Sequence, residues 1–214
     1  MTNWHTMDFP EYSVKGLDNT PEKLKAIKMP EDLTGWSVLD IGAWDGYFSF
    51  VAEKRGATDV FAVDSPLHAW ANHRQVGDVK FEVGKEGFET ARKALNSKVV
   101  DVECELDELK NITWKKKGWD LVLCLGILYH TKDPYKLIRE LYEITNKVLI
   151  LETHIDVNEA PFPIMRFYSN KEVNNDEGTI WGPNMLCVYE MLRKVGFKNI
   201  VADYNGRGVF RAEK

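Results

Sequence analysis

The sequence is poor in cysteine and contains no CxxC pair. Its three cysteines, Cys104, Cys124 and Cys187, lie far apart in a chain of 214 residues. A structural zinc site needs closely spaced ligands, and a disulfide framework needs a dense, even set of cysteines. We therefore expect neither of these and no metal site, and we interpret the cysteines as small buried residues in a reducing compartment.

Long apolar runs and an excess of basic residues are also missing. No run approaches the roughly 20 residues that span a bilayer, and residues 1–13 lack the basic start and apolar core of a signal peptide. The 28 Lys and Arg against 33 Asp and Glu give a net charge of -5, which argues against a generally basic nucleic-acid surface. We expect a cytoplasmic protein with no membrane partner, and tRNA is disfavoured as a partner.

Short apolar runs, by contrast, are frequent and alternate with amphipathic stretches. Largely continuous runs of this kind suit strands buried on both faces of a parallel sheet, and they occupy residues 36–41, 59–64, 98–104, 119–126 and 147–153. Helical patterns occupy residues 46–56, 87–96, 133–145 and 184–196, and two further strand-like runs close the chain. Strand–helix alternation with right-handed crossovers predicts an α/β fold, a doubly wound Rossmann-like sheet.

The length and the 44% hydrophobic composition fit a single domain over residues 1–214. Residues 1–30 precede the first strand, and we interpret them as an N-terminal lid or cap. An irregular segment with Pro and Asn follows the fifth run, and we interpret residues 154–182 as an insert on the acceptor side. Ligands of such sheets bind outside the carboxyl ends of the strands, so residues at those ends are the first candidates for a site.

The stretch VLDIGAWDGYFSF, residues 38–50, takes the chain from a strand into a helix. Gly42 and Gly46 let the backbone turn sharply and approach a ligand without a Cβ in the way. A dinucleotide places its pyrophosphate against bare backbone and a helix N-terminus kept free of anions. Here the loop holds bulky Trp44 and then Asp45, whose carboxylate would repel phosphate.

The next acid at a strand end is Asp64, about 20 residues beyond the glycine turn, where a carboxylate can accept ribose hydroxyls. A loop that repels phosphate but keeps this acid fits a cofactor with a cationic centre and no phosphate. S-adenosyl-L-methionine (SAM) has a sulfonium and an ammonium, which Asp40 or Asp45 can face. The alternative is a plain tight turn between strand and helix.

Together with VFAVD and WDLVLCLGILYHTKDPYKLIREL, this stretch resembles class I SAM-dependent methyltransferases. More narrowly, the chain is similar to the branch of tRNA wobble-uridine carboxymethyltransferase-like proteins, which carries LYH after the fourth strand, an ILET fifth strand and a late WGPN…ML…GF segment. The resemblance covers roughly residues 30–200 and implies a seven-stranded, mostly parallel sheet with an antiparallel last strand. It departs at Trp44, where the usual motif has Gly, although several relatives are bulky there.

The resemblance also implies cofactor contacts at the carboxyl ends of the strands. These are Asp40, Gly42 and Gly46 for the methionine part, Asp64 and Ser65 for the ribose, Leu106 and Asp107 (or Glu105) for adenine, and Leu125, Gly126 and Tyr129 beside the reacting centre. Trp44 and Asp45, from the same loop, complete the candidate cofactor set. Carboxymethylating members use a lysine and a tryptophan ahead of the first strand, and this pair has no clear counterpart here, so we expect ordinary methyl transfer from SAM.

Candidate catalytic residues follow the fourth and fifth strands. Methyl transfer is an in-line displacement, so an enzyme mostly positions the acceptor, and a base helps where the acceptor must lose a proton. His130 and His154 are candidate bases, because histidine titrates near neutral pH, and Tyr129 is a third candidate or closes over SAM. The alternatives are that His130 caps the next helix or bonds to backbone, and that His154 is an exposed loop residue.

Three further residues are candidates for acceptor binding. The apolar residues of NWHTMDF suggest that the N-terminal segment folds over the site and brings His5 to the acceptor; the alternative is a tail packed on the body. In the insert, Arg166 suits an anionic acceptor, or is a surface residue, and Trp181 is a second pocket candidate. The leading interpretation is a SAM-dependent methyltransferase with a small-molecule acceptor, and the alternative is a tRNA-modifying methyltransferase of the wobble-uridine type.

Overall fold

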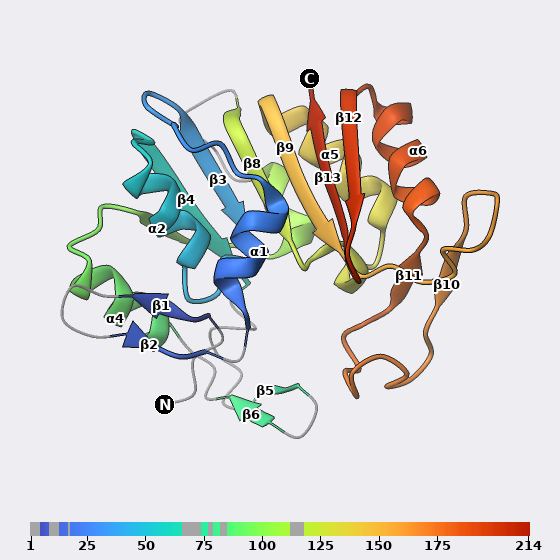
Figure 1. Cartoon of the computed structure of the whole chain (residues 1–214), viewed down its shortest axis with the longest axis horizontal. Coiled ribbons are helices and arrows are strands. Elements are labelled where there is room, and N and C mark those ends of the chain that lie inside the picture. Colours follow the sequence, from blue (N-terminus) through green and yellow to red (C-terminus); the bar gives the residue numbers. More distant parts are fainter. Residues whose placement is uncertain are drawn as a thin grey trace. The chain divides into compact units, whose positions relative to one another are not determined.

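The computed structural model describes residues 5–8, 13–16, 18–65, 74–76, 79–81, 85–111 and 118–214 (Figure 1). The contacts divide the chain into two compact units, which we describe one at a time. Unit 1 is Met1–Glu105 and unit 2 is Leu106–Lys214. In the described part of the chain, no helix has the length and apolar character that crossing a membrane requires.

The main sheet has seven strands in the order β12-β13-β9-β8-β3-β4-β7. Unit 1 contributes β3 (Ser37–Ile41), β4 (Asp59–Asp64) and β7 (Val100–Glu103), and unit 2 contributes β8 (Trp119–Leu125), β9 (Thr145–Thr153), β12 (Lys198–Tyr204) and β13 (Gly208–Glu213). The pairs β3–β4, β4–β7 and β8–β9 are parallel, whereas β13 is antiparallel to both β9 and β12. The predicted Rossmann-like sheet with an antiparallel last strand is confirmed.

In unit 1 the burial that the continuous apolar runs predict is complete in β3, where every residue is buried, and partial in β4, whereas β7 at the edge of the sheet has no buried residue. Helix α2 (Tyr47–Lys54) packs on β3 and β4. The other elements of this unit are helices α1 (Thr20–Ile27) and α4 (Glu86–Ala94) and the strand pairs β1–β2 (Met7–Asp8, Ser13–Val14) and β5–β6 (Arg74–Val76, Val79–Phe81). The helix predicted over residues 46–56 is present as α2 and is slightly shorter.

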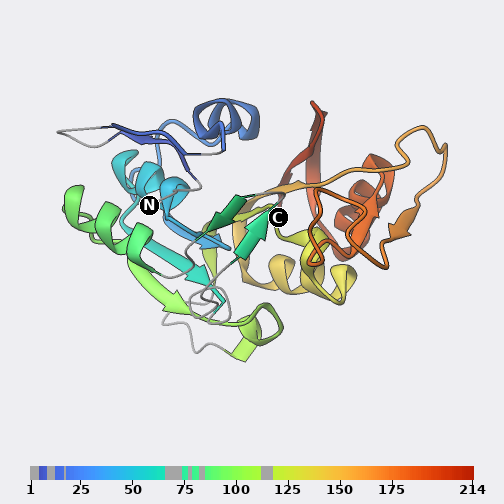
Figure 2. The same ribbon diagram turned by 90° about the horizontal axis from the view of Figure 1, so that it is seen from below.

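Unit 2 places helix α5 (Pro134–Ile144) on β8 and β9, and helix α6 (Met185–Val195) beside β12. Asp133 caps α5, because its Oδ1 accepts the backbone N–H of Lys136 at 2.9 Å. The unit also contains the 3₁₀ turns η1 (Leu106–Asn111) and η2 (Leu128–His130) and the hairpin β10–β11 (Met165–Phe167, Trp181–Pro183). Figure 2 shows this hairpin and its loop projecting from unit 2 beside α6.

Candidate active site

The loop after β3 adopts the left-handed backbone conformation at three positions. The φ angles are +74° at Gly42, +51° at Trp44 and +80° at Gly46. Glycine enters this region without steric cost, whereas an ordinary L-residue loses roughly 1–2 kcal/mol there. The backbone N–H of Gly42 donates to the carbonyl of Val63 at 2.8 Å, which attaches the loop to β4. This conformation explains why a glycine suits position 44. Trp44 adopts the same left-handed conformation and carries the backbone strain that a glycine would avoid.

Asp64, the last residue of β4, holds this loop through its carboxylate. Its Oδ2 accepts the backbone N–H of Trp44 at 2.8 Å, and its Oδ1 accepts that of Ser65 at 2.8 Å. The Ser65 hydroxyl donates to Glu105 Oε1 at 2.6 Å. The structure thus brings together the loop, the strand-end acid, its neighbour and Glu105, which the sequence offered as a substitute adenine contact.

Two carboxylates at this turn are buried, Asp40 near the end of β3 and Asp45 in the loop itself. Asp40 is 2% exposed and accepts the Ser49 hydroxyl at 2.7 Å. Burial raises the pKa of Asp40 to about 7, against the opposing effect of the Ser49 bond. Asp45 accepts the backbone N–H of His5 at 3.2 Å. Both acids are therefore bonded to protein groups, and their predicted contacts with the charged ends of a cofactor stay predictions.

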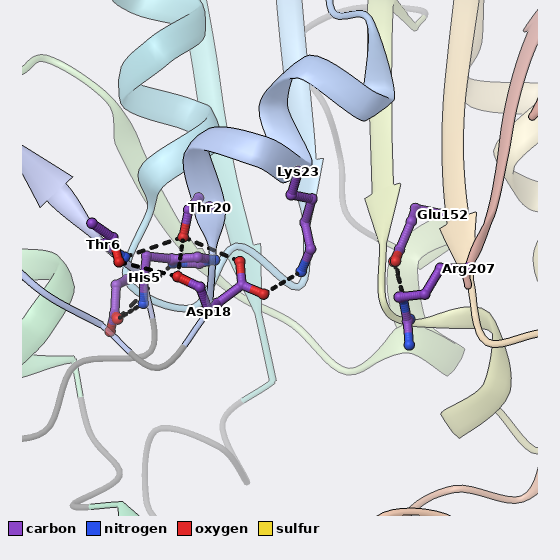
Figure 3. Close-up of polar contacts among 8 residues, drawn as sticks. His5, Thr6, Asp18, Thr20, Lys23, Glu152 and Arg207 are labelled. Atoms are coloured by element: carbon purple, nitrogen blue, oxygen red, sulfur yellow. Dashed lines mark hydrogen bonds and ion pairs between the residues drawn. The ribbon is translucent and has the colours of Figure 1, made fainter. Parts of the chain in front are cut away.

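His5 lies against the same loop, buried with its ring near those of Tyr47 and Phe48. Desolvation by burial lowers the pKa of His5 to about 3, so the imidazole is neutral at physiological pH. Figure 3 shows His5 and Thr6 beside Asp18 at the start of α1. The predicted approach of His5 to an acceptor stays a prediction, and Trp4 and Phe9 of the predicted lid lie outside the described residues.

A small polar network attaches the chain at Thr6 to the start of α1. The backbone N–H of Thr6 donates to Thr20 Oγ1 at 3.1 Å, and the Thr6 hydroxyl donates to the Asp18 carbonyl at 3.1 Å. Asp18 in turn forms an ion pair with Lys23 at 3.0 Å (Figure 3). These bonds explain why residues 5–8 follow a definite path over unit 1.

The candidate adenine contacts lie at the start of unit 2. Leu106 opens η1 and is half-buried, and Asp107 belongs to the same turn, although its side chain lies outside the described set. Glu105, the residue before them, is bonded to Ser65 in unit 1. The contacts of Leu106 and Asp107 with adenine stay predictions.

At the carboxyl end of β8, Leu125 and Gly126 lead into η2. Gly126 has a φ of +75°, and its N–H donates to the carbonyl of Glu152 at 2.9 Å. The ring centroids of Tyr129 and His130 are 4.1 Å apart. His130 Nδ1 lies 2.7 Å from the carbonyl of Gly178, so this nitrogen carries the proton and donates. The backbone bond given above as the alternative to catalysis for His130 is present, and the catalytic role of His130 stays a prediction.

His154, just beyond β9, is half-buried and faces Tyr129, with ring centroids 6.2 Å apart. Its Nε2 lies 3.0 Å from the Tyr168 hydroxyl, which donates to Asp156 Oδ2 at 2.7 Å. Arg166 Nη1 lies 3.3 Å from the same carboxylate oxygen. The histidine is thus part of a polar cluster and not the exposed loop residue given as the alternative, and its role as a base stays a prediction. Neither Tyr168 nor Asp156 was singled out from the sequence.

Arg207, a further residue that sequence reasoning missed, forms a two-bond ion pair with Glu152 (Figure 3). Its guanidinium also lies 5.2 Å from the centre of the Tyr129 ring. Burial lowers the pKa of Arg207, but Glu152 and Tyr129 outweigh it, and the net direction is upward. Arg207 lies between the two closing strands, and an isolated Arg between two glycines carries no signal that a local pattern search would find.

The predicted insert folds back onto the end of β8. The backbone N–H of Ile180 donates to the Tyr129 carbonyl at 2.9 Å, and Trp181 Nε1 donates to the Thr131 carbonyl at 3.0 Å. Trp181 therefore uses its polar atom to anchor the insert. Its role in an acceptor pocket stays a prediction.

A family model described as a methyltransferase domain matches residues 17–201, most of the chain. The chain belongs to this methyltransferase family. Among curated relatives, the tRNA U34 carboxymethyltransferase of Haemophilus influenzae (strain PittGG) is 26% identical over 175 residues, which are 78% of this chain and 47% of that protein. The corresponding enzyme of Nautilia profundicola is 24% identical over 83% of this chain and 53% of its own length. The chain spans about half the length of these relatives.

Solved structures share the methyltransferase fold. The N-terminal domain of EvdMO1, solved with SAH and D-fucose, has a TM-score of 0.69 and 13% identity, covering 99% of this chain and 91% of that one. A SAM-dependent methyltransferase from Mesorhizobium loti has a TM-score of 0.58 and 14% identity, covering 90% of this chain and 96% of that one. These matches confirm the predicted fold.

Gly46 is tightly packed, whereas Gly35 is not. Comparing an alanine variant at each position separates the cost of overpacking from the cost of the left-handed backbone conformation. A Cβ at Gly46 would lie 2.6 Å from ring carbons of Phe88, and at Gly35, which has a similar φ of +77°, it would meet no described atom within 4 Å. We expect Gly35→Ala to lower the free energy of unfolding by about 1–2 kcal/mol, the cost of the left-handed conformation alone. Gly46→Ala adds about 1–3 kcal/mol of overpacking. Urea unfolding measures both, and equal losses would show that Phe88 moves away freely.

Proposed function

We propose that this protein is a SAM-dependent methyltransferase that transfers a methyl group to a small-molecule acceptor. The observation that carries the proposal is the methyltransferase-domain match over residues 17–201. The structural neighbours support SAM as the cofactor, because the EvdMO1 domain was solved with SAH and the magnesium protoporphyrin IX methyltransferase of Synechocystis with bound SAM. When bound, SAM supplies an electrophilic methyl group on a sulfonium. We further propose that residues 1–214 act as one domain.

Unit 1 supplies the proposed cofactor residues for the methionine part and the ribose, and Leu106, Asp107, Leu125, Gly126 and Tyr129 of unit 2 are proposed to complete the set. Asp64 lies at the end of β4 with its carboxylate already oriented by the amides of Trp44 and Ser65, as a ribose contact requires. Asp45 adds a second negative charge to the loop. A diphosphate would meet both charges, whereas the cationic sulfonium of SAM would be attracted by them. The chemistry of these residues therefore fits SAM better than a dinucleotide.

Unit 2 supplies the proposed acceptor residues, which are Tyr129, His130, His154, Arg166 and Trp181, and we propose His5 as an additional one. The guanidinium of Arg166 is largely exposed while it pairs with Asp156, so it remains within reach of an anionic or hydroxylated acceptor. The EvdMO1 domain, which is similar in size to this chain, was solved with a sugar. That match supports a small acceptor.

The tRNA-modifying alternative is favoured by the names of the curated relatives, which act on U34 of tRNA. The matched region covers about half the length of those proteins. The net charge of -5 weighs against a phosphate-binding surface. We therefore place the small-molecule acceptor first.

Titration calorimetry and filter binding test the proposal together. We expect SAH and SAM to bind, carboxy-SAM to bind more weakly than SAM, and NAD not to bind. We also expect filters to retain no tRNA at low salt; retention that falls steeply with added salt would favour the tRNA alternative. Tighter binding of carboxy-SAM would contradict ordinary methyl transfer, and binding of NAD without SAH would contradict the cofactor.

A further inference from the structure

A chain of hydrogen bonds in unit 2 ends on the imidazole of His154. His154 Nε2 and the Tyr168 hydroxyl are 3.0 Å apart, and the same hydroxyl donates to Asp156 Oδ2 at 2.7 Å. The three residues come from the loop after β9 and from the end of β10. Such an arrangement of acid, hydroxyl and imidazole determines which ring nitrogen carries the proton.

The proton of the Tyr168 hydroxyl points to Asp156. The hydrogen bond from Tyr168, followed by the backbone N–H of Val157 and the charge of Arg166, lowers the pKa of Asp156, so the carboxylate is ionised and can only accept. Burial and the same bond raise the pKa of Tyr168, so the phenol keeps its proton. A phenol has one proton, so its oxygen accepts from His154. Nε2 of His154 is therefore protonated, and the neutral ring has its lone pair on Nδ1.

The positions of Tyr168 and Asp156 are held by backbone bonds and close packing. The N–H of Tyr168 donates to the Ile180 carbonyl at 2.8 Å, and the N–H of Asp156 donates to the Pro183 carbonyl at 3.0 Å. A Cβ at Gly182 would overlap the Tyr168 hydroxyl and Asp156 Cβ. The glycine at this position therefore leaves the space that the Tyr168 and Asp156 side chains occupy. The arrangement is therefore a built feature of the insert and its junction with β9.

We propose that His154 accepts, at Nδ1, the proton of a hydroxyl-bearing acceptor, and that Tyr168 and Asp156 are positioning residues that hold its tautomer. The proposal rests on the proposed function and specifies its acceptor as a hydroxyl. A lone pair of the acceptor oxygen forms the new O–CH₃ bond, the electron pair of the S–CH₃ bond stays on sulfur, and the hydroxyl proton moves to Nδ1. A neutral amine has its lone pair available before attack, whereas a hydroxyl gains most from a base.

Charged and titratable groups surround His154 on several sides. Burial lowers its pKa, the charge of Arg207 lowers it further, and Asp156 and Glu152 raise it, with a net direction below the ordinary 6.5. Tyr168 and Tyr129 are the other titratable neighbours. The base form is therefore present at neutral pH, and the rate is expected to fall only as the pH drops below 6.5.

Nitrogen-15 NMR of the histidine rings tests the tautomer without any ligand. The chain has five histidines, and His154→Gln assigns the signal. We expect the Nε2–H tautomer at pH 7.5 in the wild type. In Asp156→Asn the amide can donate to Tyr168, whose hydroxyl then donates to Nε2, so the Nδ1–H tautomer appears. Tyr168→Phe removes the hydroxyl that accepts from His154. Its matched control is Tyr204→Phe, at a 52% exposed tyrosine of β12. An imidazolium or an Nδ1–H ring in the wild type would overturn the proposal.

A second measurement tests the class of acceptor. The protein is incubated with [methyl-¹³C]SAM and a small-molecule cell extract, and the carbon shift of the transferred methyl distinguishes O-methyl from N-methyl and C-methyl products. We expect an O-methyl product whose formation falls about 10²–10⁴-fold in His154→Gln. Tyr168→Phe should lower kcat and should change KM by a smaller factor. Tyr204→Phe should change neither kcat nor KM. An N-methyl product, or full activity of His154→Gln, would overturn the proposal.

Calorimetry with SAH separates this inference from the proposed function. None of these substitutions is at a residue of the proposed cofactor set, and each variant should keep the wild-type affinity for SAH. Failure of the wild type to bind SAH would overturn the proposed function itself. An extract without any methylated product would contradict the small-molecule acceptor, and the NMR result would then decide the tautomer by itself.

Discussion

Asp64→Ala is expected to weaken the binding of SAH by about 100-fold or more. The Asp64 carboxylate orients the loop through the N–H of Trp44 and, in the proposed site, accepts the ribose hydroxyls. Hydrogen bonds to a charged group contribute about 1.5–3 kcal/mol each, so losing two of them accounts for at least this factor. Titration calorimetry with SAH measures the effect directly.

Asp59→Ala is the control for Asp64→Ala, since Asp59 begins the strand that Asp64 ends. We expect it to leave SAH affinity within about twofold, because ligands of such sheets bind at the carboxyl ends of the strands. Circular dichroism of both variants shows whether the fold is retained. Unchanged affinity in a folded Asp64→Ala variant would contradict the proposed ribose contact.

Arg207→Ala is expected to lower the free energy of unfolding by about 3 kcal/mol. It leaves the carboxylate of Glu152, which is 2% exposed, without its cationic partner. Breaking a buried pair costs about 3–5 kcal/mol, and the lower end applies because the Arg207 side chain is 34% exposed. Urea unfolding followed by circular dichroism measures the loss.

Two further variants show whether the unpaired charge is the cause. Arg193→Ala removes an exposed arginine that pairs with Glu190 on α6, and we expect a loss of less than about 1 kcal/mol. Combining Glu152→Leu with Arg207→Met removes both charges and should recover most of the stability, because no buried carboxylate is left unpaired. A loss in Arg207→Ala no larger than in Arg193→Ala would contradict the importance of the pair.

Much of the scaffold was predictable because its determinants are local. The continuous apolar runs predicted parallel strands, and the helical pattern over residues 133–145 predicted α5, which runs from Pro134 to Ile144. The predicted strand 98–104 is shorter, Val100–Glu103, because only these residues pair with β4. The sequence also identified the glycine loop and the acid at the end of β4, and the structure joins the two by a hydrogen bond from the Trp44 N–H to Asp64.

The polar partners of the site were not predictable, because they join residues far apart in the chain. The rule that ligands lie at the carboxyl ends of parallel strands does not cover an antiparallel strand. Because β13 runs antiparallel to β9, its first residue, Gly208, lies opposite Thr153 at the end of β9. This register brings Arg207 to Glu152, and no local pattern reports it.

The sequence by itself determined the order of strands and helices, the glycine turn and the acid at the end of β4, since each depends on neighbouring residues and on burial periodicity. Tertiary structure decided which charges and hydroxyls meet. It buried His5 beside Asp45, paired Arg207 with Glu152 and linked Asp156 through Tyr168 to His154. Those partners are chosen by strand direction and loop packing, which act over distances that sequence periodicity does not encode.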